Sequence, residues 1–411
     1  MKIGFFTDSY LPQLNGLTTS VVDSAKALER RGHEVFIIAP KYPRYKDTQK
    51  NVYRLTSVKF VDSPEMRWAL EIPEKQLLDV LRLNFDIIHG HSGGSMSLIG
   101  LQIARVKGIP FVCTYHTLLT SYTHYFFKGK IVTPRMIKIA TKFIANLCDC
   151  VIAPSSRAMD ELVSCGVEKP IKVLPSGIDL NYYKDIGKGF IRNKIKISQE
   201  VKILLYVGRL GKEKSVDFLL KAFKLIYEAN SQMAFVIIGD GPEKNNLKNQ
   251  AKELGIEKNV YFLGSINHMD IPKAYADSDL FVFASQTETQ GLAIVEALAS
   301  RVPVVAVKDN TLTDVVINEE NGYLVEKDSS IFAEKVIKIL GNKQLYSKLS
   351  KGAGESVKGF SDEIVAKRLE DIYLDLIKEK GRNKKTIKIT AKILTNHIKK
   401  LASQIKDIIS D

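Results

Sequence analysis

The sequence predicts an α/β protein built from two doubly wound parallel sheets. Short apolar runs, of the length of buried strands, alternate with longer segments in which apolar residues recur at helical spacing. The alternation is interrupted by a charged, irregular stretch at residues 181–200 and then starts again. With 411 residues, the chain is long enough for two domains with separate cores. We therefore predict two Rossmann-like domains joined by a linker.

The first half of the chain carries the first set of alternating elements. It has predicted strands at 2–7, 35–39, 86–89, 110–115 and 151–154, and predicted helices at 18–31, 95–107 and 134–149. Gly16 lies in the polar turn between the first strand and the first helix. Because Gly has no Cβ, the backbone at this turn has room for a phosphate group. The pattern G-x-G-x-x-G of dinucleotide-binding dehydrogenases is absent from the sequence.

The second half repeats the pattern. It has predicted strands at 202–208, 234–239, 259–264, 280–284 and 302–307, and predicted helices at 214–227, 291–300 and 362–380. The domains expected from these elements are 1–180 and 181–361, followed by the last helix at 362–380 and a basic tail at 381–411.

The stretch 283–306 carries two carboxylates beside a predicted helix start. Glu288 lies in the loop after a strand, and Glu296 lies on the following helix. Unpaired N–H groups at a helix start, together with the helix dipole, favour an anion. The backbone groups concerned are those of Thr289, Gln290, Gly291 and Leu292. A phosphate site beside two carboxylates suits a ligand that carries both phosphate and hydroxyl groups, such as a nucleotide sugar.

Two basic residues follow the first strand of the second half. In Gly208-Arg209-Leu210 and Glu213-Lys214, Arg209 offers a planar fork for diphosphate oxygens and Lys214 a compact charge near a helix start. A later tight turn, 239–243, contains Asp240 and follows the next strand. It either borders the same ligand or simply connects a strand to a helix.

The run Glu288-Thr289-Gln290-Gly291-Leu292, followed by Glu296-Ala297 and by 303–306, resembles the signature of family 4 of the retaining glycosyltransferases. The pattern Gly-Arg-Leu-x-x-Glu-Lys also resembles this family. The resemblance implies the GT-B fold, in which two Rossmann-like domains face a central cleft and the last helix returns to the first domain. It implies that Glu288 faces the donor sugar and Glu296 holds the ribose, while Arg209 and Lys214 neutralise the leaving nucleoside diphosphate. It also implies catalysis without a metal.

Arg301 departs from the family pattern, which usually has Gly at this position. A helix often ends with a left-handed residue, a conformation that Gly adopts without strain. Arg301 is therefore expected either to be mildly strained or to cap the helix in another way.

His116 ends a predicted strand, which places it at the cleft. The segments 115–117 and 122–125 resemble those of bacterial diacylglycerol glucosyltransferases. This implies that His116 contacts the donor sugar and that the acceptor site is shaped by Tyr122, His124 and Tyr125. Aromatic residues mixed with cations suit a membrane interface. They are Phe126, Phe127, Lys128, Lys130, Arg135, Lys138 and Lys142. The resemblance implies transfer of glucose from UDP-glucose to diacylglycerol.

The positive charge points to an anionic partner. The net charge is +14, residues 87–148 contain seven Lys and Arg but no Asp or Glu, and residues 381–411 place lysines on a helical apolar repeat. This tail either lies on a membrane or packs on the protein. We found no signal peptide and no apolar run near 18 residues, so we expect a cytoplasmic protein bound peripherally to the inner face of the membrane.

Several alternatives remain open at this stage. The acceptor could be another lipid, such as phosphatidylinositol or a glycosylated diacylglycerol, or a soluble glycan. A nucleic-acid-binding protein is disfavoured, because aromatic stacking motifs are lacking and the second domain is nearly neutral.

Two further patterns are expected to be structural. Asp277-Ser-Asp279 mimics a metal-binding D-x-D motif, but it precedes a strand of the second domain. The four cysteines are few for the length and are expected to be free, buried thiols in a reducing compartment; they are Cys113, Cys148, Cys150 and Cys165.

Overall fold

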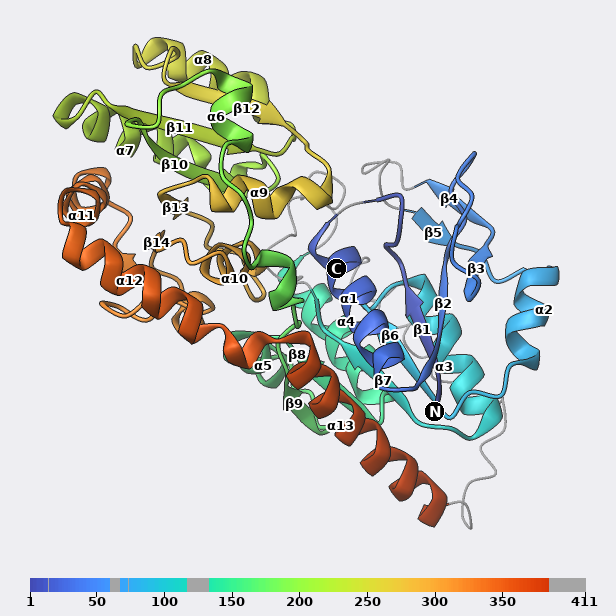
Figure 1. Ribbon diagram of the computed structural model, residues 1–411. Coiled ribbons are helices and arrows are strands. Elements are labelled where there is room, and N and C mark those ends of the chain that lie inside the picture. The colour runs from blue at the N-terminus through green and yellow to red at the C-terminus, as the bar shows by residue number, and fades with distance from the viewer. Residues whose placement is uncertain (14, 60–66, 73, 117–132, 384–411) are drawn as a thin grey trace.

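The computed structural model describes residues 1–13, 15–59, 67–72, 74–116 and 133–383, and contains two parallel sheets (Figure 1). In the described residues the first sheet has seven strands in the order β3-β2-β1-β6-β7-β8-β9 and the second has six in the order β12-β11-β10-β13-β14-β15. In both sheets the chain reverses its direction of winding beside the first strand. The predicted fold class, two doubly wound Rossmann-like domains, is confirmed.

The first domain is built on a sheet whose central strands are buried along almost their whole length, whereas the edge strands β3 and β9 are only partly buried. The strands are β1 (Lys2–Thr7), β2 (Glu34–Pro40), β3 (Val52–Leu55), β6 (Ile87–His91), β7 (Phe111–Thr114), β8 (Cys150–Ala153) and β9 (Ile171–Val173). The helices are α1 (Gly16–Arg30), α2 (Lys75–Arg82), α3 (Ser95–Lys107), α4 (Pro134–Leu147) and α5 (Ser156–Ser164). A hairpin of β4 (Ser57–Lys59) and β5 (Arg67–Ala69) lies beside the sheet.

The second domain repeats this plan. Its strands are β10 (Lys202–Val207), β11 (Met233–Ile238), β12 (Val260–Gly264), β13 (Leu280–Phe283), β14 (Val304–Val307) and β15 (Gly322–Val325). Its helices are α6 (Phe190–Ile195), α7 (Val216–Ala229), α8 (Lys244–Glu253), α9 (Ile271–Ala276), α10 (Leu292–Ala299), α11 (Ser329–Gly341) and α12 (Lys343–Ser356). The sequence patterns did not single out α8, α9, α11, α12 or β15.

The last helix, α13 (Asp362–Asn383), leaves the second domain and runs along the first (Figure 1). Val365, Leu369 and Tyr373 belong to the apolar core that also contains Ile3 and Val35 of the first sheet. The apolar face of this helix therefore completes the core of the first domain. None of the helices in the described residues has the length and apolar character needed to span a membrane.

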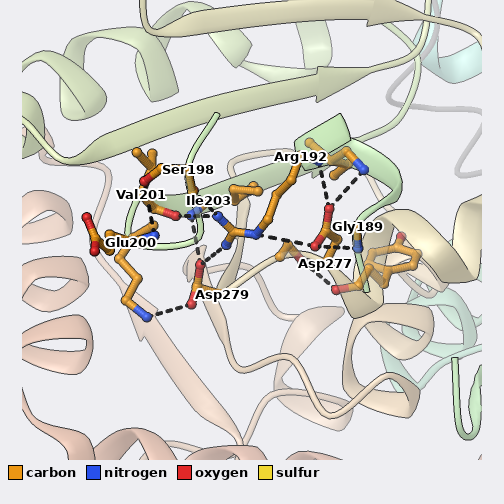
Figure 2. A network of polar contacts seen from close by, with 12 residues as sticks. Gly189, Arg192, Ser198, Glu200, Val201, Ile203, Asp277 and Asp279 are labelled. Carbon is orange, nitrogen blue, oxygen red and sulfur yellow. Dashed lines mark hydrogen bonds and ion pairs between the residues drawn. The ribbon is translucent and has the colours of Figure 1, made fainter. Parts of the chain in front are cut away.

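The stretch 181–200, expected to be an irregular linker, contains the helix α6. Its N-terminus is capped by Asp277, whose carboxylate accepts hydrogen bonds from the backbone N–H groups of Gly189, Ile191 and Arg192 at 2.8–3.0 Å (Figure 2). Arg192 also lies 3.4 Å from Asp279, whose other oxygen lies 2.9 Å from the ammonium of Lys202. The D-x-D pair thus ties the start of the second domain to β13.

In the first domain, the sequence patterns did not single out α2, α5, β3, β9 or the hairpin of β4 and β5. The remaining differences are small. The strand expected at 86–89 extends to His91, because His91 pairs with Thr7 of β1 and Thr114 of β7. Arg301 has φ +58°, so the Arg at this helix end adopts the left-handed conformation rather than a different cap. All four cysteines are buried and free.

Candidate active site

The starts of two helices from different domains meet between the sheets. α1 begins at Gly16, where Asn15 accepts a hydrogen bond from the backbone N–H of Thr18 at 2.9 Å. α10 begins at Leu292, after Gly291 with φ +80°. A Cβ placed on Gly16 would lie 3.7 Å from Cδ1 of Leu292. The two helix starts therefore lie close together, and the unpaired N–H groups of a helix start favour an anion.

Lys214 and Glu288 form an ion pair beside this region. Their Nζ and Oε1 atoms are 2.5 Å apart, and the side chains are 16% and 17% exposed. The pair forms because β10 and β13 are neighbours, so the loops after their carboxyl ends lie side by side. Burial acts to raise the pKa of Glu288, but Lys214 and a hydrogen bond from Ser285 outweigh it and lower that pKa. Glu288 is therefore a partly buried, ionised carboxylate.

Arg209 lies in the loop after β10 and is exposed. Its carbonyl accepts a hydrogen bond from the Tyr206 hydroxyl at 3.0 Å. The next residue, Leu210, donates its N–H to the carbonyl of Asp240 at 2.9 Å, so the turn 239–243 supports this loop. The carboxylate of Asp240 itself pairs with Lys244 at 2.6 Å and is 52% exposed. The backbone of Asp240 thus borders the Arg209 loop, while its charge is engaged by α8.

Glu296 is buried on α10. Its Oε2 accepts a hydrogen bond from the hydroxyl of Tyr275 at 3.0 Å. Burial raises the pKa of Glu296 to about 7, although hydrogen bonds from Tyr275 and Tyr183 act in the opposite direction. This carboxyl group is thus poised between the neutral and ionised forms near neutral pH, unlike Glu288.

Thr289 and Gln290 contact the first domain with their side chains. The hydroxyl of Thr289 donates to the carbonyl of His116 at 2.8 Å. The amide of Gln290 accepts from the N–H of Ser176 at 2.7 Å and donates to its carbonyl at 3.0 Å. These side chains fix the loop, which leaves their backbone groups as the candidates for ligand contact.

His116 ends a row of three histidine rings. Its Nε2 lies 3.1 Å from Nδ1 of His91, and the His91 ring stacks on His89 with the centroids 4.1 Å apart. His89 Nδ1 lies 2.6 Å from the hydroxyl of Tyr373 on α13. Burial lowers the pKa of His116 to about 4 and that of His89 to about 3, so both rings are neutral at neutral pH. His91 was not predicted as a site residue, because the strand was expected to end at His89.

The predicted acceptor and membrane residues are only partly described. Tyr122, His124, Tyr125, Phe126, Phe127, Lys128 and Lys130 lie outside the described residues, as does most of the tail 381–411. Arg135, Lys138 and Lys142 are exposed on α4 at a spacing of three and four residues, which makes one stripe. Lys142 also lies 3.4 Å from Glu168.

Comparison with known proteins identifies the family. Residues 14–182 match the family described as "Glycosyltransferase Family 4", and residues 187–356 match "Glycosyl transferases group 1". The chain is 32% identical over 401 residues to an alpha-monoglucosyldiacylglycerol synthase of Acholeplasma laidlawii, covering 94% of this chain and 100% of the relative. It is 33% identical to a synthase of the same name from Streptococcus pneumoniae, covering 92% of this chain and 86% of the relative.

Solved structures share the fold. The structure of Anabaena Alr3699/HepE in complex with UDP superposes with a TM-score of 0.73 at 21% identity, covering 91% of this chain and 100% of that one. Both halves of the chain match glycosyltransferase families, and similarity to the curated synthases extends over nearly the whole length. This decides between the enzyme and the nucleic-acid-binding alternative. The chain belongs to glycosyltransferase family 4 and is a glycosyltransferase of the GT-B fold.

Proposed function

We propose that this enzyme transfers glucose from UDP-glucose to the free hydroxyl of diacylglycerol at a membrane surface, with retention of the α configuration. The observation that carries the donor site is the Lys214–Glu288 pair beside the start of α10. The glycolipid product is supported by the names of the two relatives. The similarity to each of them covers more than nine-tenths of the present chain. UDP as the nucleotide is supported by its presence in the Anabaena structure.

The donor would lie between the two sheets, with its diphosphate at the helix starts. Arg209, Lys214 and the backbone groups of Gly291 and Leu292 would stabilise the charge that develops on the leaving diphosphate. Gly16 would face the diphosphate from the first domain, where the lack of a Cβ lets the backbone approach a phosphate closely. The other donor contacts would follow the family pattern: Glu288 and His116 to the hexose, Glu296 to the ribose, and the Asp240 turn beside the nucleotide.

In the proposed reaction, the acceptor oxygen forms a bond to the anomeric carbon while the bond from that carbon to the phosphate oxygen breaks. The acceptor proton passes to the leaving phosphate on the same face of the sugar. Glycoside hydrolases use a pair of carboxylates that flank the scissile bond. The proposed transfer does not need such a pair. The cations near the diphosphate would favour the step by stabilising the leaving group.

The first domain would hold the acceptor and contact the membrane. The α4 stripe of Arg135, Lys138 and Lys142 is exposed to solvent. Each cation close to an anionic leaflet contributes about 1 kcal/mol, so a few suffice for reversible docking. The aromatic and basic residues at 122–130 and the tail 381–411 belong to the same proposal. In this account the enzyme works on the inner face of the cell membrane without spanning it.

Product analysis tests the proposal. We expect radiolabelled glucose from UDP-glucose to enter a lipid when the vesicles contain diacylglycerol, and α-glucosidase, but not β-glucosidase, to release it. If the label enters a lipid only when the vesicles contain phosphatidylinositol or glucosyldiacylglycerol, the acceptor is that lipid and not diacylglycerol. Label only in a water-soluble product would move the acceptor to a soluble glycan. No labelled product with any of these acceptors would contradict the proposal.

A further inference from the structure

Helix α5 of the first domain begins directly against the second domain. The backbone N–H of Ser156 donates to a carboxylate oxygen of Asp314 at 3.0 Å. Next to it, Nη1 of Arg157 forms an ion pair with Asp309 and a 3.3 Å hydrogen bond to the carbonyl of Gln286. Asp309 is 6% exposed and Arg157 28%, so the charges meet in a largely water-excluded contact. Such a pair is less screened by salt than a surface pair.

The contact continues from Asp309 to the backbone of Glu288. The other oxygen of Asp309 accepts a hydrogen bond from the N–H of Thr311 at 2.9 Å. The hydroxyl of the fully buried Thr311 donates to the carbonyl of Glu288 at 2.8 Å. Arg157 therefore fixes the loop of Glu288 at two positions. It bonds directly to the carbonyl of Gln286, and it is linked to the carbonyl of Glu288 through Asp309 and Thr311.

Two other contacts between the domains hold the same loop. Thr289 bonds to the carbonyl of His116, and Gln290 bonds to the backbone of Ser176. These two contacts are neutral. The contact of Arg157 with the carbonyl of Gln286, by contrast, brings a formal charge from the first domain to this loop.

We propose that Arg157 is a positioning residue, whose ion pair with Asp309 places the loop 286–290, and with it Glu288, when the two domains come together. In this proposal Arg157 acts through the loop and not on the donor. The inference rests on the proposed function in one respect: Glu288 must face the donor sugar for the loop position to affect transfer. The contact makes the donor site depend on the first domain, although most of its residues come from the second.

A double-mutant cycle on transfer tests the ion pair. Arg157→Gln removes the cation, and Asp309→Asn removes the charge but keeps an oxygen that can accept from Thr311. We expect each single variant to lower kcat on the order of tenfold, within the range for coupled neighbours. The double variant should be no worse than either single one, and Arg157→Lys should recover part of the rate. The affinity for UDP, which lacks the sugar, should change less than twofold.

The matched control is Arg31→Gln. Arg31 pairs with Glu370 on α13, away from the loop, and its side chain is 33% exposed. This variant loses an ion pair of similar exposure but should keep the kcat of the original enzyme. Additive losses in the cycle, or equal losses in kcat and in UDP affinity, would overturn the inference and leave Arg157 a purely structural role.

Hydrogen exchange tests the loop contact without any substrate. Amides of residues 286–292 should exchange faster in Arg157→Gln than in the original protein, and not in Arg31→Gln. Unchanged exchange would overturn the inference. Faster exchange in Arg157→Gln, together with no transfer from UDP-glucose by the original protein, would support the loop contact but contradict the proposed function. A failure of the inference can therefore be distinguished from a failure of the proposed function.

Discussion

Lys214 keeps Glu288 ionised in a site where burial alone would favour the neutral acid. A carboxylate with a lowered folded pKa contributes stability above its usual pKa near 4.5, and this stability is lost as the pH falls. The same lysine is proposed to stabilise the leaving diphosphate. The proposal therefore gives one side chain two roles, to keep Glu288 ionised and to stabilise the leaving group of the bound donor.

Replacing Lys214 with Ala should lower kcat by about 10²–10³-fold, the effect of removing one donor from a preorganised charge site. Without the cation, the pKa of Glu288 should rise. When the pH is lowered, the residual activity of the variant should therefore be lost at a higher pH than the activity of the original enzyme. Initial rates of UDP release measured across pH test both points. Lys212→Ala is the control, because Lys212 is exposed in the same short 3-10 turn, Lys212–Lys214. Equal rates for the Lys214 variant and this control would contradict the site.

Glu296 gives a second pH test, with the opposite sign. Its folded pKa is raised to about 7, so the neutral form is favoured in the folded protein, and stability is lost as the pH rises from about 4.5 through 7. Glu296→Gln should remove this loss. The variant should match the original protein at pH 4 and exceed it in free energy of unfolding at pH 8, by about 3 kcal/mol at most. Urea denaturation at both pH values measures the difference; a constant difference would show that Glu296 does not titrate in this range.

The residues that sequence could assign are those with local signals. Arg209, Lys214 and Glu288 lie in loops that follow strands, and Glu296 lies on the helix after one such loop, so the order of the elements brings them toward the carboxyl ends of a sheet. Their proposed roles come from the family resemblance of the motifs that contain them. Arg157 also follows a strand and lies at a helix start, but it belongs to no recognised motif, and its partner Asp309 is 152 residues away in the other domain.

At the scale of elements, long-range contacts explain what the patterns missed. α6 lies in a charged stretch, and its N-terminal cap comes from Asp277, 85–88 residues further along the chain. The strand β6 extends to His91 because neighbouring strands pair with it. By contrast, helices such as α1 and α3 follow from apolar spacing and local caps, and their ends were predicted to within two residues.

The end of α10 provides a prediction at this scale. Arg301 is left-handed, with φ +58°, where a Cβ costs free energy. Arg301→Gly should stabilise the protein by about 0.5–1 kcal/mol. This net gain is the strain energy that is relieved minus the additional conformational entropy that Gly loses on folding. Arg301→Ala keeps the Cβ and should give no such gain. Urea denaturation of the two variants compares them, and equal stabilities would contradict the strain.

At the scale of the whole molecule, the active site depends on both domains. The loop 286–290 is held by His116, Arg157 and Ser176 of the first domain. Gly16 and Leu292 bring the two helix starts together. The sequence predicted two domains from repeated elements and a cleft from family resemblance, but side-chain contacts across that cleft join residues more than 100 positions apart, which no local pattern reveals.

The most direct test of the account is UDP release from UDP-glucose, measured with and without diacylglycerol in vesicles that contain anionic lipid. We predict release that requires diacylglycerol and increases with the anionic lipid, because the basic surface docks there and the acceptor completes the reaction. Release at the same rate without any lipid would contradict the lipid acceptor. An absence of release from UDP-glucose under all of these conditions would contradict the donor site itself.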